Sequence, residues 1–217
     1  MLDTFVFDVD GTLVDTNYHH AIAWFRAFRR FDLTPPLWRI HRAIGLGGDK
    51  LVGAVAGDDV EKRFGDDIRD GWSEEYAALM GEVRPFEGAR ALLEEVRKRH
   101  VGVVFASSGP ADHVEHYVDL LDARSIAQDW TTAEDAEESK PAPDLVQIAM
   151  AKVDAGSSIL LGDSTWDAEA AKNAGIPVYA VRTGGFSVDE LEEAGARRVY
   201  ESLDEIRGDL DRILGDH

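Results

Sequence analysis

The segment from Thr4 to Val14 reads TFVFDVDGTLV, an apolar run that ends in two aspartates two positions apart and a glycine. Side chains of a strand alternate between faces, so Asp8 and Asp10 are expected on the same side of the strand end. Gly11 permits a tight backbone in which peptide N–H groups can approach an anion. Two close carboxylates repel each other, which favours a bound cation or one retained proton. Asp-x-Asp-Gly is also typical of an ordinary turn, so this segment alone leaves both interpretations open.

Three further segments with reactive side chains follow later in the chain. Residues 101–109 (VGVVFASSG) lead from an apolar run into hydroxyls and a glycine, and residues 139–141 (SKP) place a lysine before a helix start. Residues 159–167 (ILLGDSTWD) form another apolar run that ends in acid. The side chains and amides concerned are those of Ser107, Ser108, Gly109, Lys140, Asp163 and Asp167.

A nucleophilic aspartate, a hydroxyl, a lysine and a metal-binding acid, in this order, resemble the four motifs of the haloacid dehalogenase-like hydrolase superfamily. The resemblance covers nearly the whole chain and implies phosphoryl transfer from a monoester. Asp8 would attack phosphorus to give an aspartyl-phosphate. Asp10 would protonate the leaving alcohol and then activate water. Mg²⁺ is expected on Asp8, the backbone carbonyl of Asp10 and Asp163, because a hard dication with oxygen ligands neutralises the developing charge.

The acid and the lysine of the later motifs each have a second interpretation. Asp167 lies four residues after Asp163 and, by family resemblance, is expected to orient a metal-bound water. It can instead sit favourably at the start of a helix capped by Ser164 or Thr165. Lys140 is expected to pair with the nucleophile and the phosphate as a point charge, whereas an isolated lysine is ordinarily solvated.

The hydroxyl motif is expected to bind phosphate. Ser107 would donate to a phosphate oxygen, with help from the amides of Ser108 and Gly109. The alternative is an ordinary strand-to-helix cap, because Pro110 follows directly.

Strand-like and helix-like stretches alternate along most of the chain. The strand-like runs are 4–8, 101–107, 128–132, 158–162 and 177–181, with a weak sixth near 198–200. Helical patterns cover 86–99, 111–121, 143–153, 165–174 and 187–193, and one closing helix is expected from Ser202. This alternation predicts the α/β class, with a Rossmann-like parallel sheet whose ligands bind beyond the carboxyl ends of the strands.

Residues 16–84 interrupt the alternation with helical patterns and no convincing strand. We expect a helical cap domain at 16–84, inserted into a core domain formed by 1–15 and 85–217, with hinges near 15–17 and 83–86. The resemblance implies the same arrangement, because a helical cap after the first motif marks the phosphoglycolate phosphatase-like and β-phosphoglucomutase-like subgroup. Recurrence of Tyr18, Ile22, Phe25 and Phe28 at helical spacing predicts the apolar face of an amphipathic helix.

The cap offers weaker candidates for substrate contact. The loop Gly45–Lys50 is rich in glycine, and Arg42 and Lys50 flank it as cations that can read a second anionic group. His20 falls where β-phosphoglucomutase-like relatives place a histidine near the hinge, although a surface histidine is the favoured interpretation. The tryptophans, among them Trp24, Trp38 and Trp72, are expected in the cap core.

Composition limits the partners. Asp and Glu number 42 against 23 Lys and Arg, a net charge of −19, which disfavours nucleic acid and anionic membranes. Solvated helix faces explain most of these acids, and a salt-adapted source is a second explanation. Cysteine is absent, which excludes disulfides and thiolate–metal sites. We find no apolar run of transmembrane length and an N-terminus that enters a strand almost at once, so neither membrane helix nor signal peptide is expected and the cytoplasm is favoured.

The favoured function is a Mg²⁺-dependent phosphatase acting on a small phosphorylated metabolite, such as phosphoglycolate or a sugar phosphate. A phosphomutase is less favoured because such relatives carry an arginine just beyond the cap-loop glycine, where residues 47–49 read GGD. A dehalogenase is disfavoured by Asp10 and Asp163, since that chemistry replaces the first acid and needs no metal. A non-catalytic binding protein would have no reason to hold this set of acids.

Overall fold

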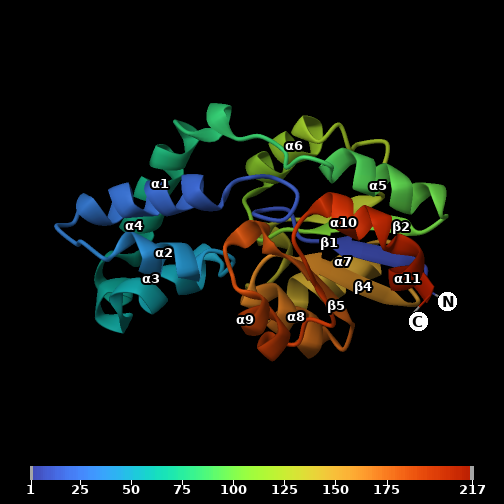
Figure 1. Cartoon of the computed structure of the whole chain (residues 1–217). Coiled ribbons are helices and arrows are strands. Elements are labelled where there is room, and N and C mark those ends of the chain that lie inside the picture. The colour runs from blue at the N-terminus through green and yellow to red at the C-terminus, as the bar shows by residue number, and fades with distance from the viewer. Residues whose placement is uncertain (1, 216–217) are drawn as a thin grey trace. The chain divides into compact units, whose positions relative to one another are not determined.

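The computed structural model describes residues 2–215, which divide into two compact units. The first unit joins the residues up to Val14 to those from Pro85 onward, and the second comprises Asp15–Arg84. Figure 1 shows the elements of both units along the chain.

The first unit is built on a six-stranded sheet in the order β3-β2-β1-β4-β5-β6, in which every pair of neighbours is parallel. This confirms the α/β class with a parallel sheet. β1 is central and pairs with β2 and β4, so that Phe7 lies opposite Phe105 and Leu161 and the carboxyl ends of these strands are adjacent. The strands are β1 Thr4–Phe7, β2 Gly102–Ala106, β3 Asp129–Thr131, β4 Ser158–Gly162, β5 Val178–Val181 and β6 Val199–Tyr200.

Helices cover both faces of the sheet, as continuous apolar strands require. One face packs Val6, Leu160 and Val178 against residues of α7 and α8, whereas α5 and α10 lie on the opposite side (Figure 1). The helices of this unit are α5 Ala89–Lys98, α6 Ala111–Leu120, α7 Asp144–Lys152, α8 Thr165–Ala174, α9 Val188–Ala194, α10 Leu203–Gly208 and α11 Leu210–Gly215, with short 3₁₀ turns η2 Ala133–Asp135 and η3 Arg182–Gly184. Within residues 2–215, no helix combines the length and the apolar composition needed to cross a bilayer.

The expected single closing helix is wrong, because two short helices follow residue 202. Ser202 caps α10 by accepting a hydrogen bond from the Glu205 amide. At Asp209 the backbone leaves helical geometry, with φ −104° and ψ 7°, and α11 starts at the next residue.

The second unit is helical throughout its regular structure. α1 packs on α2 and α4, and α3 packs on α4. Trp24 and Trp72 stack at a centroid distance of 5.0 Å within its core, as predicted, whereas Trp38 is 65% exposed, so its expected core position is wrong. The elements are α1 Asn17–Arg29, α2 Leu37–Ala43, α3 Gly48–Ala56, α4 Asp58–Ala77 and η1 Met80–Glu82.

The buried face of α1 matches the predicted one only in part, because Phe28 is buried and Phe25 packs against the core, whereas Tyr18 and Ile22 do not. Tyr18 is 59% exposed and Ile22 36%, while His20 is buried and its ring stacks on Tyr76 at 3.9 Å. The interpretation of His20 as a surface histidine is therefore wrong. α1 carries apolar side chains around most of its circumference, so periodicity alone did not identify the face that packs on α4.

Candidate functional site

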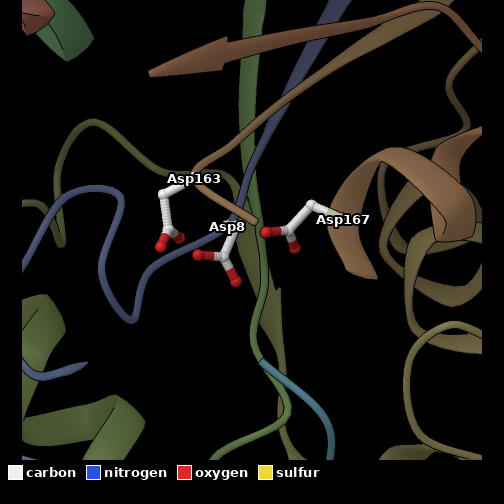
Figure 2. Close-up of side chains that lie close together, drawn as sticks. All are labelled: Asp8, Asp163 and Asp167. Atoms are coloured by element: carbon white, nitrogen blue, oxygen red, sulfur yellow. The ribbon is translucent and has the colours of Figure 1, made fainter. Parts of the chain in front are cut away.

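Three aspartates converge at the carboxyl ends of β1 and β4. Asp8 follows β1, Asp163 follows β4, and Asp167 lies in the first turn of α8. All three are buried, and one carboxylate oxygen from each lies within 4.8 Å of the others. Figure 2 shows the three side chains pointing toward one another. The adjacency of β1 and β4 in the sheet therefore brings together acids that are 155 positions apart in the sequence (Asp8 and Asp163).

Lys140 joins this cluster as a buried cation. Its Nζ lies 2.5 Å from Oδ1 of Asp8 and 2.7 Å from Oδ1 of Asp167. Three carboxylates against one ammonium leave two negative charges in excess, and such an excess is costly away from water. A divalent cation with oxygen ligands would offset it, so the donor set of Asp8, Asp163 and Asp167 fits a hard dication.

Thr12 links two of the acids and was missed in the sequence. Its Oγ1 lies 2.8 Å from Oδ2 of Asp8 and 2.9 Å from Oδ1 of Asp163. A hydroxyl carries one proton, so Thr12 donates to one carboxylate at a time and leaves the other to a cation or a proton. The hydroxyl directly after the Gly11 turn was the available signal.

The turn after β1 is tight, as expected, but its amides are already used. Gly11 has φ +82°, in the left-handed region that favours glycine. The Gly11 N–H donates to the Val14 carbonyl, and the next three N–H groups donate to the carbonyl of Val9. The expectation that N–H groups of this turn approach an anion is therefore wrong for residues 11–14.

Asp10 and the hydroxyl motif lie side by side. Ser107 is fully buried after β2, and its Oγ donates to Oδ2 of the half-buried Asp10 at 3.3 Å. The Gly109 amide donates to the Ser107 Oγ at 3.1 Å, and Ser108 lies half-buried between them. The N-cap residue of α6 is Pro110, which excludes the interpretation of Ser107 as that helix's cap.

Asp167 lies at the start of α8, as its second interpretation expected, and its carboxylate also belongs to the acid cluster. Its Oδ2 accepts hydrogen bonds from the amide and the hydroxyl of Ser164, and the Ser164 Oγ accepts from the Asp167 amide at 3.3 Å. This reciprocal capping box fixes the carboxylate at the start of α8. Its Oδ1 is thereby left facing Lys140 and the other acids. Ser164, not Thr165, is the cap.

Two glycines give these carboxylates room, and sequence reasoning did not identify either. A Cβ on Gly184, in the turn after β5, would overlap the carboxylate of Asp163 and lie 2.7 Å from its carbonyl oxygen. A Cβ on Gly162 would overlap the side chain of Asp167. The backbone at these glycines therefore approaches Asp163 and Asp167 closely and fixes their positions. The Gly-Gly pair at 184–185, after an apolar strand, was the sequence signal available for Gly184.

The buried cluster shifts the acidity of its members. Burial raises the pKa of Asp8 to about 7, the charges of Asp167 and Asp10 add to the effect, and Lys140 opposes it. Burial alone would lower the pKa of Lys140, but Asp167 and Asp8 hold it above its ordinary value. Lys140 therefore stays a cation at neutral pH, and Asp8 without a metal binds a proton more readily than an exposed aspartate does.

The cap candidates lie on three helices of the second unit. His20 is on α1, the half-buried Arg42 on α2, and the half-buried Lys50 in the first turn of α3. α3 starts at Gly48, inside the glycine-rich loop.

The chain is similar to known proteins in both its sequence and its fold. The family model "Haloacid dehalogenase-like hydrolase" matches residues 5–181. Validoxylamine A 7'-phosphate phosphatase from Streptomyces hygroscopicus subsp. limoneus is 28% identical over 210 residues, which cover 93% of this chain and 94% of that protein.

Solved structures show the same similarity. A hydrolase from Pseudomonas syringae has a TM-score of 0.91 and 30% identity, covering 97% of this chain and 99% of its own. CbbY from Rhodobacter sphaeroides, in complex with phosphate, has a TM-score of 0.77 and 25% identity, covering 95% and 96%.

Proposed function

Because the chain belongs to the haloacid dehalogenase-like hydrolase family, we propose that it is a Mg²⁺-dependent phosphatase that hydrolyses a small phosphorylated metabolite through an aspartyl-phosphate. The observation that carries the proposal is the position of Asp8. Asp8 directly follows the central strand β1. Its carboxylate contacts the buried ammonium of Lys140 and lies beside those of Asp163 and Asp167. The phosphatase relative and the phosphate-bound CbbY structure support phosphorylated compounds as the substrate class.

In the first step, a carboxylate oxygen of Asp8 forms a bond to phosphorus as the bond from phosphorus to the ester oxygen breaks. Asp10 gives its proton to the leaving oxygen, which departs as an alcohol. Asp10 suits this role because it is near Asp8 yet only half-buried, so it exchanges protons with solvent.

In the second step, Asp10 takes a proton from a water whose oxygen attacks phosphorus. The bond between phosphorus and Asp8 then breaks, which releases phosphate and restores the carboxylate. Asp8 attacks as the anion, and its contact with Lys140 favours that form against the effect of burial.

The other residues of the site would bind the phosphoryl group and neutralise its negative charge. Lys140 would balance negative charge on the phosphoryl group as well as on Asp8, and Ser107 with the Ser108 amide would donate to phosphate oxygens. The Gly109 amide donates to the Ser107 Oγ, so it would join them only by exchanging that hydroxyl for a phosphate oxygen. Asp8, Asp163, Asp167 and the backbone carbonyl of Asp10 would hold Mg²⁺, which when bound supplies electrostatic stabilisation of the transferring phosphoryl group.

We further propose that Asp15–Arg84 acts as a cap domain that selects the substrate. Arg42 and Lys50 are cations suited to a second anionic group of a phosphorylated metabolite. His20 is buried against Tyr76, so a role near substrate would require its ring to leave that stack.

The test is release of phosphate from a panel of phosphorylated metabolites by purified protein with Mg²⁺. We expect continuous release without a sugar bisphosphate primer. Isomerisation of β-glucose 1-phosphate faster than phosphate release would instead identify a phosphomutase, and no turnover of any phosphate ester would overturn the proposal.

A further inference from the structure

A cavity of about 310 Å³ lies in the first unit between α11 and the outer strands β5 and β6. Six residues line it: Tyr179, Arg197, Arg198, Tyr200, Arg212 and Ile213. Half of these are arginines and none is an acid, in a chain whose net charge is −19. Like charges gathered around one small cavity repel each other, and a bound anion would offset that repulsion.

The cavity is separate from the aspartate cluster. Arg197 and Arg198 directly precede β6, at its amino end. Asp211 of α11 pairs with Arg99 at 2.8 Å, just before β2 begins, and Figure 1 shows α11 at the end of the sheet where β1 starts. Asp8 and Asp163 instead follow the carboxyl ends of their strands. The two sites thus lie toward opposite ends of a parallel sheet.

One of the three arginines is held in a fixed position. The Nη1 of Arg198 lies 2.9 Å from Oδ2 of Asp209, and the Tyr200 hydroxyl donates to the same oxygen at 2.8 Å. The Arg198 guanidinium also lies over the Tyr200 ring, 5.1 Å from its centroid. A guanidinium has five N–H donors, so this pairing leaves others for a ligand.

Arg212 is the arginine most directly available to a ligand. It is exposed on α11, and no acid among residues 2–215 forms an ion pair with it. Its charge therefore adds to the positive wall of the cavity without a fixed counterion in that part of the chain.

We propose that this cavity binds a small oxyanion with two or more negative charges, namely the phosphate group of inorganic phosphate or of a phosphate monoester. Guanidinium groups match phosphate oxygens with paired N–H donors, which favours phosphate over a monovalent anion. The volume suits a ligand at the small end of the usual range for binding pockets. This site is independent of hydrolysis, because no residue that lines it has a role in the proposed reaction.

Calorimetric titration of the metal-free protein with inorganic phosphate, in chelator and at constant ionic strength, tests the proposal. We expect Arg212→Ala to bind one phosphate fewer than the wild type, or to bind it at least about tenfold more weakly. Arg97→Ala, which removes an exposed arginine of α5 outside the cavity, is the matched control and should bind as the wild type does. A parallel titration with glycerol phosphate identifies whether free phosphate or an ester binds more tightly.

The double variant Arg197→Ala/Arg212→Ala guards against compensation by a neighbouring arginine, and its thermal unfolding reports whether it folds. Phosphate ester hydrolysis with Mg²⁺ should be unchanged in Arg212→Ala, so loss of the cavity site is distinguished from failure of the catalytic assignment. If both variants bind phosphate and glycerol phosphate with wild-type stoichiometry and affinity, the proposal is wrong.

Discussion

The Lys140 ammonium and the Asp8 carboxylate form a buried ion pair, 2.5 Å from Nζ to Oδ1, with side chains 1% and 6% exposed. Asp167 contacts the same ammonium from α8 at 2.7 Å. Lys140 therefore has two effects. It opposes the rise in the Asp8 pKa that burial causes, and it offsets repulsion between the two carboxylates.

Replacing Lys140 by Met should remove both effects. We expect hydrolysis of a phosphate ester to fall by about a hundredfold or more, because a preorganised charge at the reacting group is lost. Without a metal, the Asp8 pKa should rise further. Lys152→Met is the matched control, because Lys152 also lies near two aspartates, Asp129 and Asp135, but outside the cluster. Initial rates for the two variants decide the matter, and equal rates would contradict the role given to Lys140.

Chelation should abolish hydrolysis, and Mg²⁺ should restore it. Asp163→Ala should need far more Mg²⁺ for half-maximal activity, because it removes one of the three clustered carboxylates. Ca²⁺ should substitute poorly, since its higher and looser coordination does not hold the reacting groups in line. Activity is measured against metal concentration, with Asp129→Ala as the control aspartate. Full activity in excess chelator is the outcome incompatible with this prediction.

Gly184→Ala should displace Asp163 and raise the Mg²⁺ requirement, because the added Cβ overlaps that carboxylate. Gly208→Ala is the control, since a Cβ there meets nothing within 4 Å. Metal titrations of activity and the Mg²⁺-induced rise in unfolding temperature give two independent measurements. If Gly184→Ala has the Mg²⁺ requirement and the Mg²⁺-induced stabilisation of the wild type, the turn after β5 accommodates the Cβ without displacing Asp163, and the prediction is wrong.

The stability of the metal-free protein should depend on the protonation of Asp8. Its folded pKa of about 7 is above the ordinary value of 3.8, so the folded state holds this proton more tightly than the unfolded state. The stabilisation of the folded state by this proton is fully present below about pH 4 and is lost as pH rises through about 7. In Asp8→Asn the free energy of unfolding should not show this decrease with pH, because the amide does not titrate. Urea unfolding of both proteins in chelator from pH 4 to 8 measures the difference, and parallel pH profiles would count against the assignment.

The strands and the acid positions were predictable because both follow from local pattern. Apolar runs identify buried strands, and the carboxyl ends of parallel strands meet at one edge, so Asp8 and Asp163 could be placed there from the sequence. The contact of Thr12 with both acids and the space left by Gly184 depend on chain segments far apart in sequence, and no spacing rule reports them.

The buried face of α1 was not predictable for a different reason. Ala21, Trp24 and Phe28 are buried, but Ile22 and Phe25 between them are also apolar, so the helix has no single apolar stripe. Packing on α4 selects the face, and with it the burial of His20.

As the proposed nucleophile, Asp8 should become phosphorylated during turnover. Asp10→Asn should slow hydrolysis of the aspartyl-phosphate, because the residue that activates water is lost. This variant and the wild type are each mixed with an aryl phosphate and Mg²⁺, and the reactions are quenched in acid. Mass spectrometry of the peptide containing Asp8 should then show one added phosphoryl group, and Asp8→Asn should show none and keep less than about a hundredth of the wild-type activity. An unmodified Asp8 peptide in the quenched variant, together with an active Asp8→Asn protein, would contradict the account.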